Sequence, residues 1–366
     1  MDSNDQIDVT SGEHQVQVEP GVLISVIVPV HNGLHVIDRC LEAIRLSKYP
    51  NFEVLVVDDC STDTTPQIVK NFGVECLKTL RRIGPAGARN LGAEHGRGEI
   101  LAFVDADVVL PPEGLGIVAE AFARDSSLAA VFGSYDDEPT CGTFISQYKN
   151  LVHHHIHQSS PEQAVTFWAG CGAVRKRIFH IVGGFDETAY TTSSVEDIAF
   201  GLELTMRGYP IRLEKRLTVK HLKLWTVSSL LRVDIFGRAV PWTRLILKSG
   251  KVPRTLNLNY RSRISAVLIA LLVGMDLSLL AFASVRRNLL PSAMFGVAIT
   301  CALLLVLNCD VYLFFWRKRG LLFAARAIVV HWVYYLYSGL TFVIVAVDAL
   351  LRSRLSAWRG VKSSKG

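Results

Sequence analysis

The sequence predicts an α/β domain on a parallel sheet, followed by helices that belong to a membrane. Within residues 21–225, short apolar runs alternate with helix-like stretches, a pattern typical of a parallel sheet covered by helices. Beyond residue 263, three apolar runs are each long enough to span a bilayer. The mean hydropathy of +0.29 is high for a wholly soluble chain of 366 residues.

Three apolar runs are the first predicted strands, and each is followed by polar residues. The runs cover 22–30, 53–58 and 99–105, with helices expected at 35–47, 64–72 and 85–95 between or after them. Further along, we expect a helix at 114–124, a strand near 128–133, a strand-like stretch at 164–174 and a helix that begins near Asp197. Ligands of open α/β sheets bind at the carboxyl ends of strands, so the polar residues there predict one shared crevice.

Charge divides the chain into two unlike parts. Residues 1–225 hold 20 Lys and Arg against 29 Asp and Glu, whereas residues 226–366 hold 19 against 4. A nucleic-acid-binding protein would present a basic face on a folded domain, so we expect no nucleic acid as a partner. An acidic head and a basic, apolar rear are instead typical of a protein seated on anionic lipid headgroups.

The predicted domains follow from these patterns. Residues 1–20 form an acidic, disordered arm, 21–225 a catalytic head, 226–263 amphipathic interfacial helices, and 352–366 a basic tail. The interfacial stretch can also be a surface helix packed on the head. The predicted membrane helices, 264–351, comprise 264–285, 289–316 and 321–351.

The orientation in the membrane is predicted from the basic flanks. The cationic residues before the first span indicate a multi-pass membrane protein with a cytoplasmic head. Three full spans would place the basic tail on the opposite side, so either one segment is re-entrant or the tail departs from the positive-inside rule.

Asp105 and Asp107 are the strongest chemical signal. Two carboxylates one residue apart, at the end of a buried strand, can bind Mg²⁺ or Mn²⁺, which in turn binds the phosphates of a substrate. Glu196 and Asp197 stand where a helix begins, and the helix N-terminus favours the ionised carboxylate, suited to a general base. Simple capping of that helix is the alternative interpretation.

Three further groups of residues are weaker candidates. Asp58 and Asp59 follow a strand and can accept hydrogen bonds from a nucleobase or ribose, or belong to a turn that caps the next helix. Arg89 lies in a Gly-rich helix start and can reach a phosphate. We interpret the cluster of four histidines within 153–157 as a polar face near the site rather than a zinc site.

The motifs together resemble family 2 glycosyltransferases of the GT-A fold. The matching stretches, all within residues 22–225 and in the order of the family, are ISVIVPVHNG, VLVVDDCSTD, GPAGARNLGA, ILAFVDADVVLP, GCGAVRK followed by VGGFDE, and SSVEDIAFGLEL. Cys60 replaces a glycine usual in the second motif, so a turn with positive φ would be strained. The QxxRW motif of processive polymerases is missing, which favours transfer of a single sugar.

The resemblance implies a role for each matching residue. Pro29 and Val30 would line the base pocket, Asp58 or Asp59 would hold the base or ribose, and Arg89 would face the diphosphate. Asp105 and Asp107 would be the DxD pair, with Asp107 the direct metal ligand and His221 a further one. Gly170 and Gly172 would flank a turn that faces the sugar or acceptor, and Asp197 would be the base, with Glu196 beside it.

The predicted function is therefore inverting, metal-dependent transfer of one sugar. The donor is a nucleotide-diphosphate sugar, and the acceptor is a membrane lipid, either a polyprenyl phosphate, as the resemblance to polyprenyl-phosphate glycosyltransferases implies, or a hydroxyl lipid. With a phosphate acceptor, Asp197 would orient rather than deprotonate it. Two alternatives remain, a nucleotidyltransferase on the same fold and a non-catalytic nucleotide-sugar binder, and a homo-oligomer is also possible.

Overall fold

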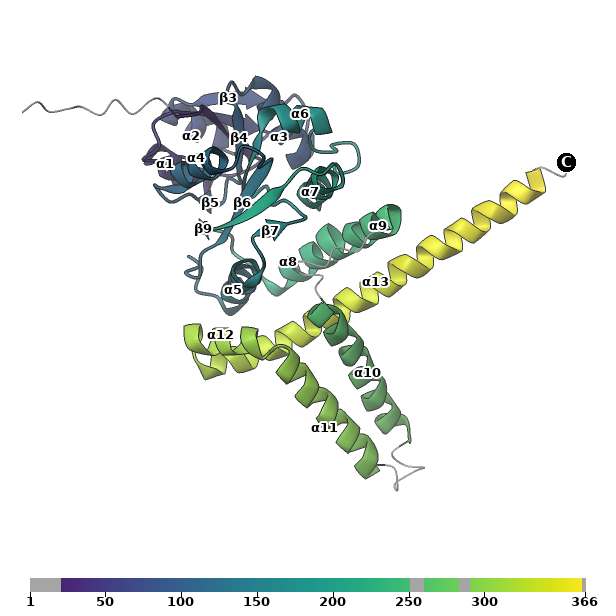
Figure 1. Ribbon diagram of the computed structural model, residues 1–366. Helices are drawn as coiled ribbons and strands as arrows, with labels where there is room; N and C mark the ends of the chain where they lie inside the picture. The colour runs from purple at the N-terminus through teal and green to yellow at the C-terminus, as the bar shows by residue number, and fades with distance from the viewer. Residues whose placement is uncertain (1–20, 251–259, 283–289, 364–366) are drawn as a thin grey trace, which may run out of the picture.

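The computed structural model describes residues 21–250, 260–282 and 290–363, and it shows a head from which long C-terminal helices extend (Figure 1). The predicted acidic arm (1–20) and the end of the basic tail (364–366) lie outside the described residues. So do residues 251–259, which belong to the predicted interfacial stretch, and 283–289, where the first predicted span ends and the second begins.

The head is built on a mixed sheet whose strands follow the order β3-β2-β1-β4-β8-β6-β9-β5, with β7 paired to β9. The first half is parallel, as predicted, whereas β8 runs antiparallel to both β4 and β6. The strands are β1 (Ile24–Val30), β2 (Phe52–Asp58), β3 (Glu75–Lys78), β4 (Ile100–Val104), β5 (Val108–Val109), β6 (Ala130–Tyr135), β7 (Gln163–Ala164), β8 (Cys171–Arg175) and β9 (Ile211–His221). The strand-like stretch 164–174 is thus two strands joined by a loop.

Helices cover both faces of this sheet. Alternate residues of β1 explain why, because Val26 and Val28 belong to one buried cluster and Ile27 to the other. The first cluster includes apolar residues of α1 (Ile37–Arg45) and α4 (Gly114–Arg124), and the second those of α3 (Gly84–His95), α6 (Lys176–Val182) and α7 (Glu196–Met206). The other helices of the head are α2 (Thr65–Phe72) and α5 (Phe144–Ser159).

The chain after the head is helical throughout its described residues. It forms α8 (Val227–Arg232), a π-helical segment η1 (Val233–Ala239), α9 (Val240–Ser249), α10 (Tyr260–Phe282), α11 (Leu290–Leu307), α12 (Cys309–Arg319) and α13 (Leu321–Ser363). Among these residues, Tyr260–Leu279 and Leu321–Ser353 are long and apolar enough to cross a membrane. The pair Pro291–Leu307 and Cys309–Arg319 qualifies only if it is taken as one broken or re-entrant span.

The predicted span 289–316 is not one straight helix, because α11 and α12 meet at an angle of 68°. Asn308 lies at the bend and is buried. Its amide donates to the carbonyl of Leu304 and to the hydroxyl of Ser265, and its oxygen accepts from Tyr335. A side chain that makes polar contacts with two neighbouring helices gives a physical reason for the bend.

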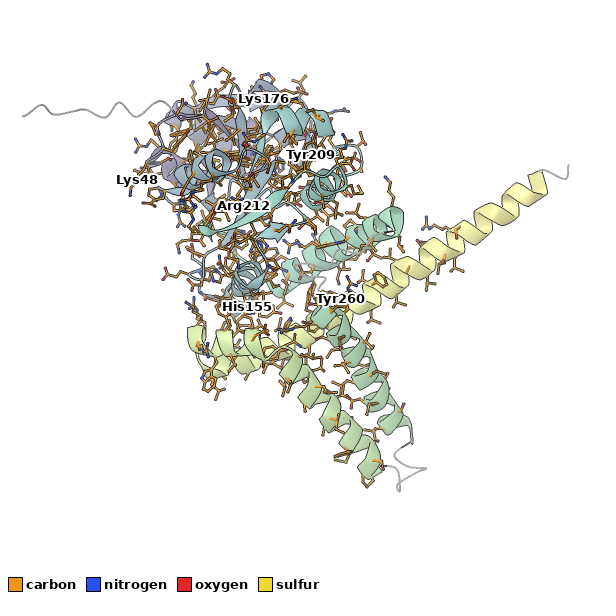
Figure 2. The ribbon with its side chains drawn as sticks, viewed as in Figure 1. Lys48, His155, Lys176, Tyr209, Arg212 and Tyr260 are labelled. Carbon is orange, nitrogen blue, oxygen red and sulfur yellow. The ribbon has the colours of Figure 1, made fainter. Side chains whose placement is uncertain are left out.

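The helices after the bend are packed against the head. Tyr148 and Leu151 of α5 form an apolar cluster with Phe315 of α12 and Ala327 of α13. Figure 2 shows His155 of α5 on the side of the head that faces these helices, and its imidazole lies 3.9 Å from the carboxylate of Asp310. The C-terminal helices therefore continue the packing of the head as well as including the candidate membrane spans.

The turn after β2 carries the strain that the sequence predicts. Cys60 has φ of +61°, in the left-handed region that glycine adopts without a Cβ clash. We predict that Cys60→Gly raises the free energy of unfolding by about 1 kcal/mol, measured by denaturant unfolding of the detergent-solubilised protein. Cys60→Ala keeps the Cβ and serves as the control, so equal gains in both variants would contradict a strained turn.

Candidate functional site

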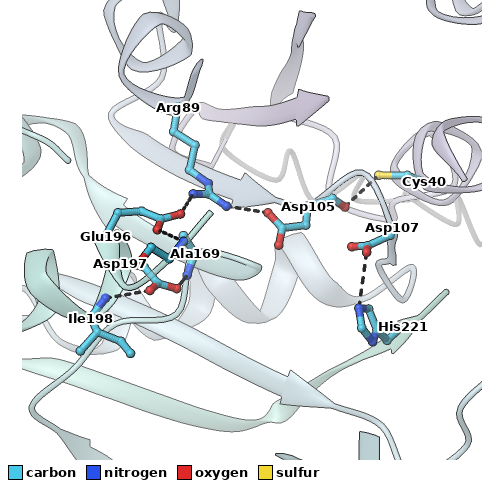
Figure 3. Close-up of polar contacts among 10 residues, drawn as sticks. Cys40, Arg89, Asp105, Asp107, Ala169, Glu196, Asp197, Ile198 and His221 are labelled. Carbon is cyan, nitrogen blue, oxygen red and sulfur yellow. Dashed lines mark hydrogen bonds and ion pairs between the residues drawn. The ribbon is translucent and has the colours of Figure 1, made fainter. Parts of the chain in front are cut away.

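Asp107 and His221 are brought together by the pairing of β5 with β9. Val108 lies opposite His221 in this antiparallel pair, and the amide of Leu222 donates to the carbonyl of Asp107 at 2.8 Å. The register therefore places the imidazole Nε2 of His221 3.5 Å from Oδ2 of Asp107 (Figure 3). Burial opposes ionisation of Asp107, but the hydrogen bond from His221 and the positive charges nearby outweigh it and lower the pKa of Asp107.

Tyr135, at the end of β6, fixes the orientation of His221. The two rings are stacked with centroids 4.2 Å apart and an interplanar angle of 13°. The ring of Tyr135 also contacts those of His153 and Trp168, with centroids 4.3 Å and 4.9 Å away, respectively. Tyr135 could not be predicted as a residue of the site from its sequence context, because its ring partners come from three separate segments of the chain.

Arg89 bridges the DxD region to the start of α7. Its guanidinium donates to Oδ1 of Asp105 at 2.7 Å and to Oε1 of Glu196 at 3.0 Å, and its side chain is only 6% exposed (Figure 3). Burial disfavours the charged guanidinium, but the two carboxylates outweigh it and raise the pKa of Arg89. Glu196 is fixed further by the amide of Ser194, which donates to Oε2.

Asp197 lies beside this bridge on the same helix start. Its carboxylate accepts from the amides of Ala169 (3.1 Å) and Ile198 (2.8 Å). Burial, and secondly the charge of Glu196, raise the pKa of Asp197 to about 7, while the attraction of Arg89 opposes the rise. A carboxylate with a pKa near neutrality can accept a proton from a substrate hydroxyl under physiological conditions.

Asp58 and Asp59 follow β2, and the structure gives them different surroundings. The carboxylate of Asp59 accepts from the amides of Ile83 and Gly84 and from the hydroxyl of Thr79, so it holds the N-terminus of α3. Asp58 accepts from the amide of Ser61 at 3.1 Å. Both side chains are buried. The contacts of Asp59 are structural, which leaves Asp58 the better candidate of the two for a nucleoside.

The remaining predicted residues line the same sheet edge. Pro29 and Val30 end β1, next to β2, whose last residue Asp58 pairs with Val30. Gly170 accepts a hydrogen bond from the amide of Asp105 through its carbonyl at 3.0 Å, and Gly172 lies in β8 opposite Phe103. The structure thus brings the strand ends of β1, β2 and β4 and the loop before β8 together at one edge of the sheet.

A close backbone contact joins α3 to the loop before α7. Gly84 has φ of +80°, and a Cβ on it would lie 2.2 Å from the carbonyl oxygen of Thr191. Only glycine fits this approach. It brings the helix that carries Arg89 against the segment that leads to Glu196.

The four histidines belong to α5, a helix, and lie next to the site. His154 and His157 contact the backbone carbonyls of Tyr135 and Gly133 through Nδ1. His153 packs at tilted angles against the rings of Tyr135, His157 and Trp168, and burial lowers its pKa well below the usual range. Through Tyr135, which also stacks on His221, the helix that carries the histidines supports the candidate site.

Asp107 and His221 offer an oxygen and a nitrogen ligand to a divalent cation. Within the described residues, no three His, Cys, Asp or Glu side chains gather closely enough to hold a metal ion by themselves. Asp105, the third candidate ligand, is engaged by Arg89. This set fits a Mn²⁺ or Mg²⁺ ion that takes its remaining ligands from water and substrate phosphates, as such ions usually do.

A large cavity lies on the other side of α7 from these residues. Its volume is about 1050 Å³, and its walls include Leu202 and Met206 of α7 and Leu245 of α9. The carboxylates of the candidate site do not line it. The candidate site at the sheet edge is therefore separate from this cavity.

We predict that Arg89→Met destabilises the protein by about 3 kcal/mol, because it leaves the carboxylates of Asp105 and Glu196 without their buried cation. Denaturant unfolding of the solubilised chain measures the loss. Arg97→Met is the matched control, since Arg97 pairs with Glu53 but is 77% exposed, and we expect a much smaller loss there. Equal losses in the two variants would contradict a structural role for the Arg89 bridge.

Comparisons with known proteins agree with this geometry. Residues 25–182 match the model of the family described as glycosyl transferase family 2. Glycosyltransferase AglE of Haloferax volcanii is 42% identical over 91 residues, which cover 23% of this chain and 30% of that protein. An Escherichia coli protein, UDP-Glc:alpha-D-GlcNAc-diphosphoundecaprenol beta-1,3-glucosyltransferase WfgD, is 29% identical over 133 residues, which cover 35% of this chain and 52% of WfgD.

A solved structure supports the fold over most of the chain. The mannosyltransferase PcManGT from Pyrobaculum calidifontis, solved in complex with GDP-Man and Mn²⁺, superposes with a TM-score of 0.52 at 19% sequence identity. The superposition covers 89% of this chain and 86% of PcManGT. The match to glycosyl transferase family 2 thus runs from β1 to α6 of the head, and the sheet order and this superposition show that the head has the GT-A fold.

Proposed function

We propose that this chain is an inverting, metal-dependent glycosyltransferase that moves one sugar from a nucleotide-diphosphate sugar to a membrane lipid. One observation supports this most strongly. The DxD carboxylates and the Asp197 carboxylate lie on either side of the Arg89 bridge, so a leaving-group site and a proton acceptor share one crevice. Such a pairing is what direct displacement at an anomeric carbon requires.

The donor would lie along the strand ends. Pro29, Val30 and Asp58 would contact the nucleoside, and the diphosphate would lie beside Asp107 and His221, which would hold a Mn²⁺ or Mg²⁺ ion. Such an ion neutralises the negative charge that develops on a leaving diphosphate. Gly170 and Gly172 would leave room for the sugar in front of β8. The Mn²⁺ and GDP-Man in the structure of PcManGT support this arrangement.

The acceptor oxygen would attack from the side of Asp197. It forms a bond to the anomeric carbon while the bond to the diphosphate oxygen breaks, which inverts the configuration of that carbon. Asp197 takes the proton of a hydroxyl acceptor, and with a phosphate acceptor it orients an oxygen that is already ionised. Glu196 keeps Arg89 in place and so preserves the spacing between the two halves of the site.

The membrane location of the acceptor rests on two further observations. The described residues include two helices that are long and apolar enough to cross a bilayer. A bent pair of helices could form a third span. The name of WfgD gives a diphosphoundecaprenol-linked acceptor for that relative. With the basic flanks of the helices, these observations favour transfer to a lipid at the cytoplasmic face.

The direct test is transfer by the full chain in membranes supplied with Mn²⁺. We expect label from the sugar of a UDP-, GDP- or dTDP-sugar to appear in the lipid fraction, and a chelator to abolish this. Label from the nucleotide would instead support a nucleotidyltransferase. If neither label reaches the lipid with any donor, the chain is not the enzyme that we propose.

The pKa of Asp197 predicts how the rate depends on pH. For a hydroxyl acceptor, the carboxylate must be ionised, so kcat/KM should rise with pH up to about 7 and then level off. Asp197→Asn should lower kcat about 100-fold or more and remove this rise, while donor binding survives. Asp38→Asn on the exposed face of α1 is the control. A near-normal rate in Asp197→Asn would exclude Asp197 as the base.

A further inference from the structure

Three cationic side chains gather where the head meets the C-terminal helices. We call Lys149, Lys223 and Arg238 the junction cations; they come from α5, from the segment after β9 and from η1. The indole of Trp225 lies between two of them, with the Lys223 ammonium 4.6 Å and the Lys149 ammonium 5.9 Å from its ring centroid. Arg238 lies on the same π-helical segment as the carboxylate that it shares with Lys149.

That carboxylate is Asp234, and it is only 5% exposed. Lys149 pairs with it at 2.6 Å, Arg238 lies 3.8 Å away, and the hydroxyl of Tyr337 donates to its other oxygen at 2.8 Å. Because the Lys149 ammonium is already paired with Asp234, we do not assign it a role in ligand binding. Burial, with repulsion from Arg238 and Lys223, lowers its pKa to about 8.

Among the described residues, Asp234 is the one carboxylate that forms an ion pair with a junction cation, and its single charge offsets one of the three. The acidic loop 136–138 is engaged elsewhere, since Lys220 pairs with Asp136 and Lys318 with Asp137. Arg238 and Lys223 therefore form a site of net positive charge, and an anion is the ligand that such a site attracts.

The position of the junction relates it to both substrates. Lys223 follows His221 by two residues along the chain, so it lies next to the donor side of the candidate site. Tyr337 belongs to α13, a candidate membrane helix, and Phe236 beside Arg238 is 70% exposed. In addition, the indole N–H of Trp225 is buried and has no acceptor in the part of the chain that the structure describes. An amphipathic anion that enters from the lipid would meet these groups before it reaches Asp197.

We propose that Arg238 and Lys223 bind the phosphate of the acceptor, which makes the acceptor a lipid that carries a phosphate or diphosphate at its polar end. This rests on the proposed function and selects one of the two acceptor classes, because a hydroxyl lipid without phosphate would bring no negative charge to these two cations. The π-helix is central to the arrangement, since it presents Asp234 and Arg238 on one turn and fixes Arg238 through the buried carboxylate.

The test is binding of short-chain probes to the detergent-solubilised full chain, which needs no catalysis. Calorimetry compares farnesyl monophosphate, farnesyl diphosphate and farnesol, with Mn²⁺ and saturating UDP and GDP present to occupy the donor site. We expect either phosphate to bind at least 10-fold more tightly than farnesol, and Arg238→Gln or Lys223→Gln to weaken phosphate binding about 10-fold. Arg232→Gln, an exposed cation on α8, is the control and should bind as wild type.

The outcomes separate this inference from the proposed function. Equal affinity for farnesol, or unchanged phosphate binding in both variants, would overturn the inference while sugar transfer could still occur. Competition by inorganic pyrophosphate alone, without a contribution of the prenyl chain, would identify a free-phosphate site and contradict a lipid acceptor. Arg238→Lys should keep part of the affinity that Arg238→Gln loses, which a purely structural role for Arg238 would not predict. The prenyl phosphate that binds more tightly, monophosphate or diphosphate, identifies the acceptor type.

Discussion

The arrangement of the site depends on one buried guanidinium. Arg89 lies on α3, Asp105 follows β4, and Glu196 begins α7, so one side chain joins three elements that are distant in the sequence. A buried cation of this kind stabilises a structure only when carboxylates surround it. Its two salt bridges fix the spacing between the end of β4, where Asp107 would meet the donor, and the start of α7, where Asp197 would meet the acceptor. Arg89 was expected to face the diphosphate, and in the structure its guanidinium bridges Asp105 and Glu196.

The second constraint is strand register. A shift of one residue between β5 and β9 would turn the side chain of His221 to the opposite face of the sheet and away from Asp107. Two close contacts restrict the site further. Tyr135 stacks on the ring of His221, and Gly84 approaches the backbone of Thr191 so closely that α3 cannot shift relative to the loop before α7. The site is thus defined by backbone pairing and small residues as much as by its charged groups.

The sequence was sufficient for the features that depend on local pattern. Apolar runs with polar ends located β1, β2 and β4 to within two residues, and the Gly-to-Cys replacement at position 60 indicated a turn that does have positive φ. The sequence was insufficient where residues distant in the chain determine the contacts of a side chain or the shape of a helix. Asp59 is chemically the same as Asp58, yet its contacts with the N-terminus of α3 exist only once β2 and α3 have folded together. The bend at Asn308 depends on Ser265 and Tyr335 in the same way, so an apolar run of 28 residues appeared to be a single span.

The account can be tested most directly at its central interaction, through a double-mutant cycle of Arg89→Met and Glu196→Gln. The free energy of unfolding of the wild type, both single variants and the double variant gives the coupling between the two side chains. A buried, hydrogen-bonded ion pair predicts a coupling of about 2 kcal/mol or more, so the double variant should be far less destabilised than the sum of the single ones. Additive losses would contradict the account, since they would mean that Arg89 does not hold α7 against the end of β4.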